Sequence, residues 1–269
     1  MNSSENNEAN PHLVEILSEQ NPQLTPQGLS EIFPSYKDFD LEKETDLWTT
    51  KPINAVLNLQ KNKQEKIIFL LSGVAASGKD AIRERITNLS PQLIYKPVTA
   101  TSRSPREGEK DGVDYFFYDT HQDFLEDVED DQFIEYINQG DSKNPRYYGL
   151  PKKSLNQALN RPAPVICSQV EIESGWPAVS RYAQRHPAKP FVFKVFVLPK
   201  ISFNEYTQNW LPNRRNNVDT RIYKAAKEIS LAASQSHFIL NNDLNQGKHI
   251  LDSYSQSILN QIKPLLKKS

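Results

Sequence analysis

The sequence contains almost no cysteine and little glycine. Its 269 residues include 1 cysteine, Cys167, and 9 glycines. A single cysteine can form neither an internal disulfide nor a cysteine-based zinc site. Glycine makes up about 3% of the chain, compared with roughly 7% in average proteins, which excludes a collagen-like chain. We expect the few glycines to serve turns with positive φ or the close approach of a ligand.

Long hydrophobic runs and a large net charge are also missing. The longest apolar runs, Ile67–Leu71 and the lysine-interrupted Phe191–Leu198, are far shorter than the roughly 18 residues that span a bilayer. The first thirty residues are polar and lack the basic and apolar segments of a secretory signal. The formal net charge of −1 argues against a broad nucleic-acid or membrane surface. We therefore expect a cytoplasmic protein without nucleic-acid or membrane partners, and the sequence gives no indication of an oligomeric state.

The chain divides near residue 60 into two parts of different composition. Residues 1–66 carry 6 Lys and Arg against 11 Asp and Glu, and residues 67–269 carry 26 against 22. We predict an N-terminal extension over residues 1–60, disordered at first and followed by short helices. The mildly basic remainder, 61–269, would form the main domain and hold any anionic ligand.

Short apolar runs alternate with amphipathic stretches along this main domain. Continuous apolar runs rich in β-branched residues are typical of strands buried in a parallel sheet. The predicted strands are Ile67–Leu71, Val165–Ser168, Phe191–Leu198 and His237–Leu240, and the predicted helices are Lys79–Leu89, Pro151–Asn160, Gly175–Arg185, Asp219–Ser234 and Leu244–Lys263. This alternation predicts an α/β fold with a doubly wound parallel sheet. An insert over 99–161, with an aromatic strand (115–118) and an acidic helix (120–131), would form a small lobe beside a core of 61–98 and 162–269.

The segment Gly73-Val-Ala-Ala-Ser-Gly-Lys-Asp80 lies between the first predicted strand and the first predicted helix. It fits G-x-x-x-x-G-K, the pattern of the phosphate-binding P-loop, in all but the final Ser or Thr. In such a loop, backbone N–H groups and a helix N-terminus surround phosphate oxygens, and Lys79 adds a full positive charge. The predicted phosphate site consists of Gly73, Val74, Ala75, Ala76, Ser77, Gly78, Lys79 and Asp80.

Asp80 departs from the P-loop pattern. The usual hydroxyl gives Mg²⁺ a neutral oxygen ligand, whereas a carboxylate is a stronger ligand that also brings negative charge near the phosphates. Either Mg²⁺ neutralises Asp80 and the loop works, or repulsion leaves a loop that binds nucleotide poorly. Aspartate is also an ordinary residue for the first turn of a helix. We expect a working loop with Asp80 as a Mg²⁺ ligand.

A second group of residues is suited to a phosphorylated acceptor. Arg103 and Arg106 lie three residues apart on a loop that Pro105 stiffens, so both guanidinium groups can contact one phosphate. Tyr115 and Tyr148 add two phenol donors. This pattern predicts a clamp for a phosphate monoester.

Glu135, in the segment Phe133-Ile-Glu-Tyr136, is a candidate for reading a base. A carboxylate accepts hydrogen bonds from the adjacent N1–H and N2–H₂ of guanine, whereas adenine offers no such pair of donors. This selectivity is worth several kcal/mol when a mismatch would bury an unpaired charge. The alternative is that Glu135 is an ordinary strand residue whose side chain lies in solvent.

These motifs follow an order that resembles the guanylate kinase family. They are GVAASGKD (73–80), TSRSPREGEKDGVDYFF (101–117), FIEY (133–136) and the YYG turn (147–149). The resemblance covers about Lys66 to Ile262 and implies a P-loop sheet core, a small α+β GMP-binding lobe and a lid at about 203–220. It also implies ATP-dependent phosphoryl transfer to GMP or dGMP, giving GDP, with Mg²⁺ as cofactor.

The resemblance also implies roles for individual residues. Those for GMP are Thr99, Arg103, Arg106, Tyr115, Glu135, Tyr148 and Glu171. Those for ATP are the P-loop residues together with Asn241 and Asn242, and the catalytic charges are Lys79, Arg214, Arg215 and Arg221. Besides Asp80, several positions depart from the family: Thr99 replaces a serine, Asn241 replaces an aspartate, and Leu150 stands where the family has Ser or Thr. The segment that contains Glu171 is one residue longer, and the stretch from Glu135 to Tyr148 is a few residues longer.

Two other functions remain open. Ribose bisphosphate phosphokinases share the implied fold and resemble this chain in the GKD and NND segments, but they lack its DGVDY and FIE segments. Guanylate kinase-like domains of scaffolding proteins bind peptides after losing P-loop function. Asp80 and Ala76 favour such a non-catalytic binding module, whereas Lys79 and the lid arginines oppose it.

Overall fold

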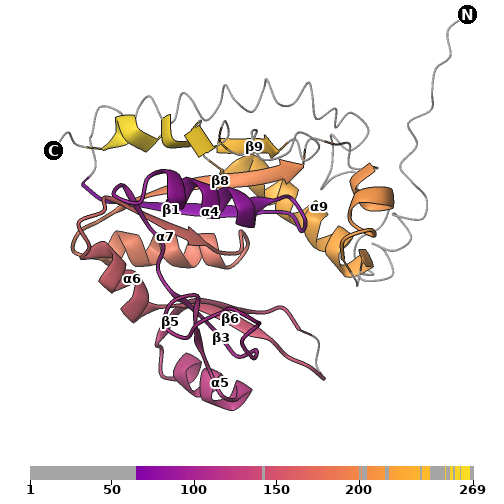
Figure 1. Ribbon diagram of the computed structural model, residues 1–269, viewed down its shortest axis with the longest axis horizontal. Helices are drawn as coiled ribbons and strands as arrows, with labels where there is room; N and C mark the ends of the chain where they lie inside the picture. The colour runs from indigo at the N-terminus through magenta and orange to yellow at the C-terminus, as the bar shows by residue number, and fades with distance from the viewer. Residues whose placement is uncertain are drawn as a thin grey trace, which may run out of the picture.

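The structure of the protein is a computed structural model. It describes residues 65–140, 143–199, 201, 205–215, 218–236, 238–242, 252, 255–256, 258–260 and 262–266. The predicted extension over 1–60 and most of the predicted helix over 244–263 lie outside these residues. Figure 1 shows a sheet with helices on both faces and a smaller lobe beside it.

A five-stranded parallel sheet forms the core. In sheet order its strands are β2 (Ile94–Tyr95), β7 (Val165–Gln169), β1 (Ile67–Gly73), β8 (Phe191–Pro199) and β9 (Phe238–Asn242). All seven residues of the central strand β1 are buried. A strand without a polar face is stable where both faces of the sheet are covered, as in doubly wound α/β folds. The predicted fold class is confirmed, although β2 is too short for a sequence pattern to predict.

Helices cover both faces of this sheet (Figure 1). One face carries α6 (Lys152–Leu159), α7 (Gly175–Arg185) and α9 (Val218–Gln235), and the other carries α4 (Lys79–Leu89). On the first face, Ile68 and Leu70 pack in one hydrophobic cluster with Trp176 of α7. On the second face, Phe69 packs with Ile82 of α4. Alternate residues of β1 therefore belong to different clusters, and apolar burial on both sides fixes the sheet between the helices.

Cys167 lies in the middle of β7, within the cluster on the α4 side. Its free thiol is fully buried. Burial raises the pKa of the thiol to about 12, so the thiol stays protonated at neutral pH. Cys167 is therefore a packing residue.

The insert forms a lobe with its own four-stranded sheet. In sheet order its strands are β4 (Tyr115–Phe117), β3 (Thr99–Thr101), β6 (Tyr147–Pro151) and β5 (Phe133–Asn138), and α5 (His121–Glu129) packs beside them. The Thr120 side chain caps α5 by accepting a hydrogen bond from the N–H of Asp123 at 3.1 Å. Phe124 of α5 stacks on Phe133 with ring centroids 4.6 Å apart. The predicted aromatic strand and acidic helix are both present, whereas the expected YYG turn is part of strand β6.

The predicted boundaries agree best where the sequence pattern is long. The predicted helices over 79–89 and 175–185 have the bounds of α4 and α7. The strand predicted over 191–198 ends one residue later. Within the described ranges, no helix combines the length and the hydrophobicity that crossing a membrane requires.

Gly73 ends β1 in a space that excludes a side chain. A Cβ there would lie 2.5 Å from the Val197 carbonyl oxygen and 2.9 Å from the Ser77 Oγ. We expect Gly73→Ala to lower the free energy of unfolding by about 3 kcal/mol, because a backbone carbonyl cannot move aside. Urea denaturation followed by circular dichroism measures this loss.

Gly108→Ala is the matched control for this substitution. Gly108 has a φ of +84°, but a Cβ added there would meet no atom within 4 Å, so only the conformational cost of about 1 kcal/mol applies. A loss for Gly73→Ala no larger than that for Gly108→Ala would contradict the steric explanation.

Candidate active site

The P-loop connects the carboxyl end of β1 to the amino end of α4. Gly78, the N-cap of α4, has a φ of 81°, and Ala76 has a φ of 58°. Left-handed residues within such a turn direct successive N–H groups to one side and create a concave anion site. The helix N-terminus adds partial positive charge at the same place. Gly78 adopts this conformation freely, whereas Ala76 adopts it at a cost of about 1 kcal/mol.

Two aromatic side chains hold the carbonyl groups of the P-loop from outside. The Tyr206 hydroxyl donates to the Ala75 carbonyl oxygen at 2.9 Å, and Trp210 Nε1 donates to that of Ala76 at 3.0 Å. Both donors lie on a short π-helical turn, Tyr206–Trp210, within the segment predicted to be the lid. Because the C=O and N–H of one peptide unit share a plane, these bonds also fix the N–H groups of Ala76 and Ser77, and the Ser77 N–H donates to the Val74 carbonyl oxygen at 3.2 Å.

Asn242, at the end of β9, holds the next carbonyl group. Its buried Nδ2 donates to the Ser77 carbonyl oxygen at 2.8 Å. Its Oδ1 has no hydrogen-bond partner among the described residues. This P-loop contact is additional to the adenine contact that the resemblance implies. Asn241 pairs with Leu198 through the backbone of β9 and β8, and its side chain lies outside the described part of the structure.

Lys79 places a cation at the first residue of α4. Its ammonium group donates to the Val74 carbonyl oxygen at 3.3 Å. Burial lowers the pKa of Lys79, and the carboxyl groups of Asp80 and Glu228 oppose this shift. Burial also raises the pKa of Glu228 to about 7, while Lys224 and Lys79 act in the opposite direction. A partly desolvated ammonium group with one long hydrogen bond is available to a phosphate.

Asp80 stands beside this cradle with its carboxylate in solvent. Its side chain is 68% exposed, and Oδ1 lies 4.0 Å from a guanidinium nitrogen of Arg83. Mg²⁺ in phosphate sites typically uses one or two carboxylates and completes its shell with water and phosphate oxygens. Within the described ranges, no group of three or more His, Cys, Asp or Glu side chains could hold a metal ion. The donor set therefore fits Mg²⁺ that arrives together with a nucleotide.

Arg103 is held in one position by its surroundings. Glu109 accepts hydrogen bonds from NH1 and NH2 at 2.6 and 2.7 Å, and Nε lies 3.1 Å from the Tyr148 hydroxyl. The guanidinium carbon lies 5.1 Å from the centre of the Tyr115 ring and 5.7 Å from that of Phe117. The bidentate pair lowers the pKa of Glu109 to about 2 and raises that of Arg103. The guanidinium group is thus oriented and charged before any ligand binds.

The other residues predicted for the acceptor phosphate lie around Arg103. The Tyr115 and Tyr148 rings pack edge to face with centroids 6.1 Å apart. Thr99 is half-buried and pairs with Tyr115 between β3 and β4. Arg106 is exposed, and its backbone N–H donates to Glu109 at 2.7 Å. The structure therefore brings Arg103, Tyr115 and Tyr148 into contact and leaves the Arg106 side chain at the surface.

Glu135 is a buried carboxyl group in β5. Its Oε2 has no hydrogen-bond partner within the described ranges, although the Leu150 N–H donates to the carboxyl group. Burial, and then the neighbouring Glu171, raises the pKa of Glu135 to about 8. A Cβ on Gly175 would lie 3.5 Å from Oε2, so this glycine leaves room beside the carboxyl group. A buried acid with an unused oxygen is suited to accept hydrogen bonds from a ligand.

Glu171 lies in the loop after β7 and is tied to α9. It forms an ion pair with Lys224 and accepts a hydrogen bond from the Ser174 hydroxyl at 3.0 Å. Glu173, two residues on, pairs with Lys227 at 2.6 Å. The ion pairs place α9 against the loop that approaches Glu135 from the core side.

The three predicted lid arginines have different surroundings. Arg214 is exposed and stacks on Trp210, with its guanidinium carbon 3.2 Å from the ring centre. Arg215 is also exposed. Arg221 in α9 is half-buried, and burial followed by repulsion from Arg215 and Arg146 lowers its pKa. Cations that repel one another would be stabilised by a polyanion placed among them.

Several roles in this site are not predicted from the sequence. They belong to Glu109, Arg146, Tyr206, Trp210 and Glu228. In the sequence, the possible signal for Glu109 was the glycine before it, Gly108. A glycine can adopt the positive φ that the structure shows here and so turn the loop back on Arg103. Tyr206 and Trp210 are 131 and 134 residues from their P-loop acceptors, a separation for which no spacing rule exists.

Comparisons with known proteins agree with this geometry. The family model for guanylate kinase matches residues 64–257. A guanylate kinase of Onion yellows phytoplasma (strain OY-M) is 28% identical over 184 residues, which cover 68% of this chain and 82% of the relative. A guanylate kinase of Carboxydothermus hydrogenoformans is 30% identical over 188 residues, which cover 70% of this chain and 86% of the relative.

A solved structure shows the same fold. The crystal structure of guanylate kinase from Anaplasma phagocytophilum aligns with a TM-score of 0.52 and 22% identity, covering 77% of this chain and 89% of that chain. The family match takes in the P-loop, the lobe and α9. The chain therefore belongs to the guanylate kinase family and is a nucleoside monophosphate kinase.

Proposed function

We propose that the protein transfers the γ-phosphoryl group of ATP to GMP or dGMP. One observation supports this proposal. The fold contains two places suited to anions, the P-loop and Arg103, together with the buried carboxyl group of Glu135, which is suited to recognise a base. The relatives in phytoplasma and Carboxydothermus are named guanylate kinases, which supports GMP as the acceptor. A nucleotide with a phosphate and a guanine base matches both parts of the acceptor site.

The P-loop would hold the phosphates of ATP. Phosphoryl transfer requires alignment and positive charge around the transferring group more than covalent help from the protein. The loop N–H groups and the Lys79 ammonium group supply this charge without reorganisation. Asp80 would hold Mg²⁺, which when bound neutralises charge on the β- and γ-phosphate oxygens.

The Arg103 clamp would orient the acceptor phosphate for in-line attack. Arg106, Tyr115 and Tyr148 would share this phosphate with Arg103. Because Glu109 occupies the two terminal guanidinium nitrogens, an incoming phosphate would exchange one anionic partner of Arg103 for another. The guanidinium group is then never left buried without a partner, which would cost several kcal/mol.

Glu135 would select guanine. Its carboxylate can accept the N1–H and N2–H₂ donors of the base, with Thr99 and Glu171 nearby in the acceptor site. Leu150 carries no side-chain donor for the guanine O6, so discrimination rests on Glu135 more heavily than it would with Ser or Thr at 150.

The lid arginines would complete the charge around the phosphates. Arg214, Arg215 and Arg221 belong to or follow the proposed lid over 203–220, and closure would exclude water from the site. The lid bounds, the extension over 1–60 and the cytoplasmic location stay predictions.

An acceptor assay tests the proposed function. We expect turnover of GMP and dGMP with Mg²⁺ and ATP, and a kcat/KM for GMP at least about a hundredfold above that for AMP. A coupled spectrophotometric assay with GMP, dGMP, AMP and ribose phosphates measures both. Turnover of a ribose phosphate without turnover of GMP would contradict the proposal and support a sugar phosphokinase.

Lys79→Ala tests the catalytic role of the P-loop. We expect kcat to fall at least about a hundredfold, because one preorganised charge is lost, while the Kd for GMP stays within about twofold. Lys153→Ala, at an exposed position of α6, is the control and should retain activity. Full activity of Lys79→Ala would remove the loop from the mechanism.

Absence of Mg·ATP binding to the unmodified protein in calorimetry would favour the non-catalytic binding module.

Glu135 should link GMP binding to pH. Its pKa is about 8 in the free site, and guanine donors favour the ionised form, so binding at pH 7 releases a proton. The affinity for GMP should therefore rise with pH by up to about tenfold per unit below pH 8 and level off above it. Titration calorimetry from pH 7 to 9 measures this rise. The phosphate of GMP ionises in the same way when GMP binds to Glu135→Gln, so this variant is the control and its affinity should not rise with pH. An equal pH dependence of the affinity in this variant would contradict the role of Glu135.

A further inference from the structure

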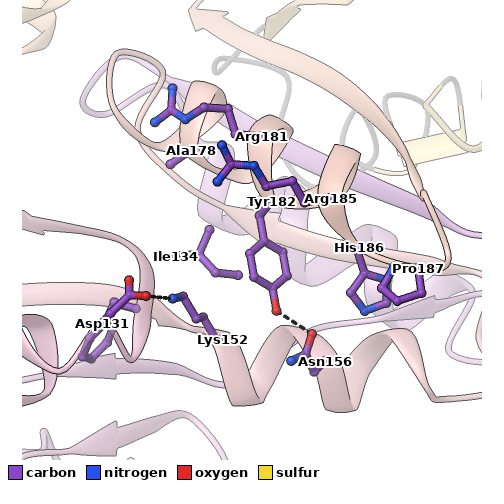
Figure 2. Close-up of a pocket in the computed structure, with 11 residues that line it drawn as sticks. Asp131, Ile134, Lys152, Asn156, Ala178, Arg181, Tyr182, Arg185, His186 and Pro187 are labelled. Atoms are coloured by element: carbon purple, nitrogen blue, oxygen red, sulfur yellow. Dashed lines mark hydrogen bonds and ion pairs between the residues drawn. The ribbon is translucent and has the colours of Figure 1, made fainter.

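A cavity of about 650 Å³ lies between the lobe and the core, apart from the nucleotide sites (Figure 2). One wall is formed by the start of β5 and by α6, and the other by α7 and the two residues that follow it. Phe133 and Ile134 of β5 line this cavity, and none of the residues predicted for the nucleotide sites is among its lining residues.

The cavity carries an excess of positive charge. Arg181 and Arg185 are four residues apart on α7 and therefore lie on one face of the helix. In Figure 2 both guanidinium groups extend to the same side of α7, and Ile134 and Tyr182 lie between them and the Lys152–Asp131 pair. Lys152 and Asp131 form an ion pair with an N···O distance of 2.5 Å, so the carboxylate in the lining is already neutralised. Both guanidinium groups are exposed, and neither makes a hydrogen bond or ion pair with the residues that the structure describes.

The floor of the cavity is apolar and held in place. Tyr182 projects from α7 toward α6, and its hydroxyl donates to the Asn156 Oδ1 at 2.7 Å. Ile134 lies beside the Tyr182 ring (Figure 2), and Ala178, four residues earlier on α7, also lines the cavity. His186 stands next to Tyr182 with ring centroids 6.1 Å apart. An aromatic or aliphatic group of a ligand could pack on this surface.

We propose that this cavity binds a small phosphate monoester with an apolar or aromatic body. The volume lies within the roughly 300–1,000 Å³ of small-molecule sites. Two guanidinium groups on one helix face can each contact a different oxygen of one phosphate. Tyr182, Ile134 and Ala178 would contact the body of the ligand. Since the walls come from the lobe and from α7, a bound ligand would bridge the two parts of the fold.

Phenyl phosphate is a suitable probe, because it contains the phosphate and the aromatic body and nothing else. Titration calorimetry is performed on the full chain without nucleotide, because GMP is itself a phosphate monoester with an aromatic base and would compete for the cavity. We expect the unmodified protein to bind phenyl phosphate, and Arg181→Ala with Arg185→Ala should weaken this binding at least about tenfold. Inorganic phosphate should bind more weakly than phenyl phosphate by about fivefold or more, because it lacks the body.

Lys153→Ala with Lys189→Asn removes the same number of charges outside the cavity and serves as the matched control. Both lysines are exposed, and asparagine tolerates the positive φ of 40° at residue 189. Undiminished affinity in this control, with loss in the double arginine variant, supports the site. Equal binding to the unmodified protein and the double arginine variant, or no binding to either, would overturn it. Equal affinities for phenyl phosphate and inorganic phosphate would overturn the apolar half of the proposal.

Discussion

The fixed orientation of three P-loop carbonyl groups is the constraint on which the rest of the site depends. Tyr206, Trp210 and Asn242 each hold one of three consecutive carbonyl oxygens. A neutral hydrogen bond contributes only about 1 kcal/mol to stability. Together, however, these bonds decide which side of the loop presents its N–H groups. Two of the donors belong to the segment that leads to the predicted lid arginines, so one segment both contacts the P-loop and carries Arg214 and Arg215.

Positive charge is kept in the site in two different ways. Arg103 is compensated by Glu109 and enclosed by aromatic rings, so its orientation is fixed before any ligand binds. Arg221 is instead partly desolvated and repelled by Arg215, and both effects lower its pKa. The first arrangement favours orientation of a single phosphate, because the guanidinium group is already in position before the phosphate binds. The second favours affinity for a polyphosphate, because binding relieves repulsion.

Local patterns in the sequence were sufficient for the main elements and for the phosphate loop. The apolar run of β1 and the helical spacing of α4 are visible within a few residues, and the P-loop motif lies between them. The strands β2 and β3 have two and three residues, which are too few to show the alternation of buried and exposed residues that identifies a strand in a sequence. Their pairing depends on partners elsewhere in the chain.

Contacts between distant segments could not be derived from the sequence. The bond from Asn242 to the Ser77 carbonyl joins residues 165 positions apart. The raised pKa of Glu135 results from burial and from Glu171, and both conditions exist only after the lobe has packed on the core. The Phe133–Tyr136 motif therefore identified Glu135 as a candidate, but the protonation state of its carboxyl group is a property of the folded chain.

The burial of Cys167 has a practical consequence for following motion in this enzyme. The chain has no second cysteine, and a thiol with a pKa of about 12 inside a sheet hardly reacts with maleimide dyes. A cysteine introduced at an exposed position such as Asn213 would then be the one site that such a dye labels. Fluorescence from that dye could report movement of the segment around Trp210 in a protein that keeps its natural interior.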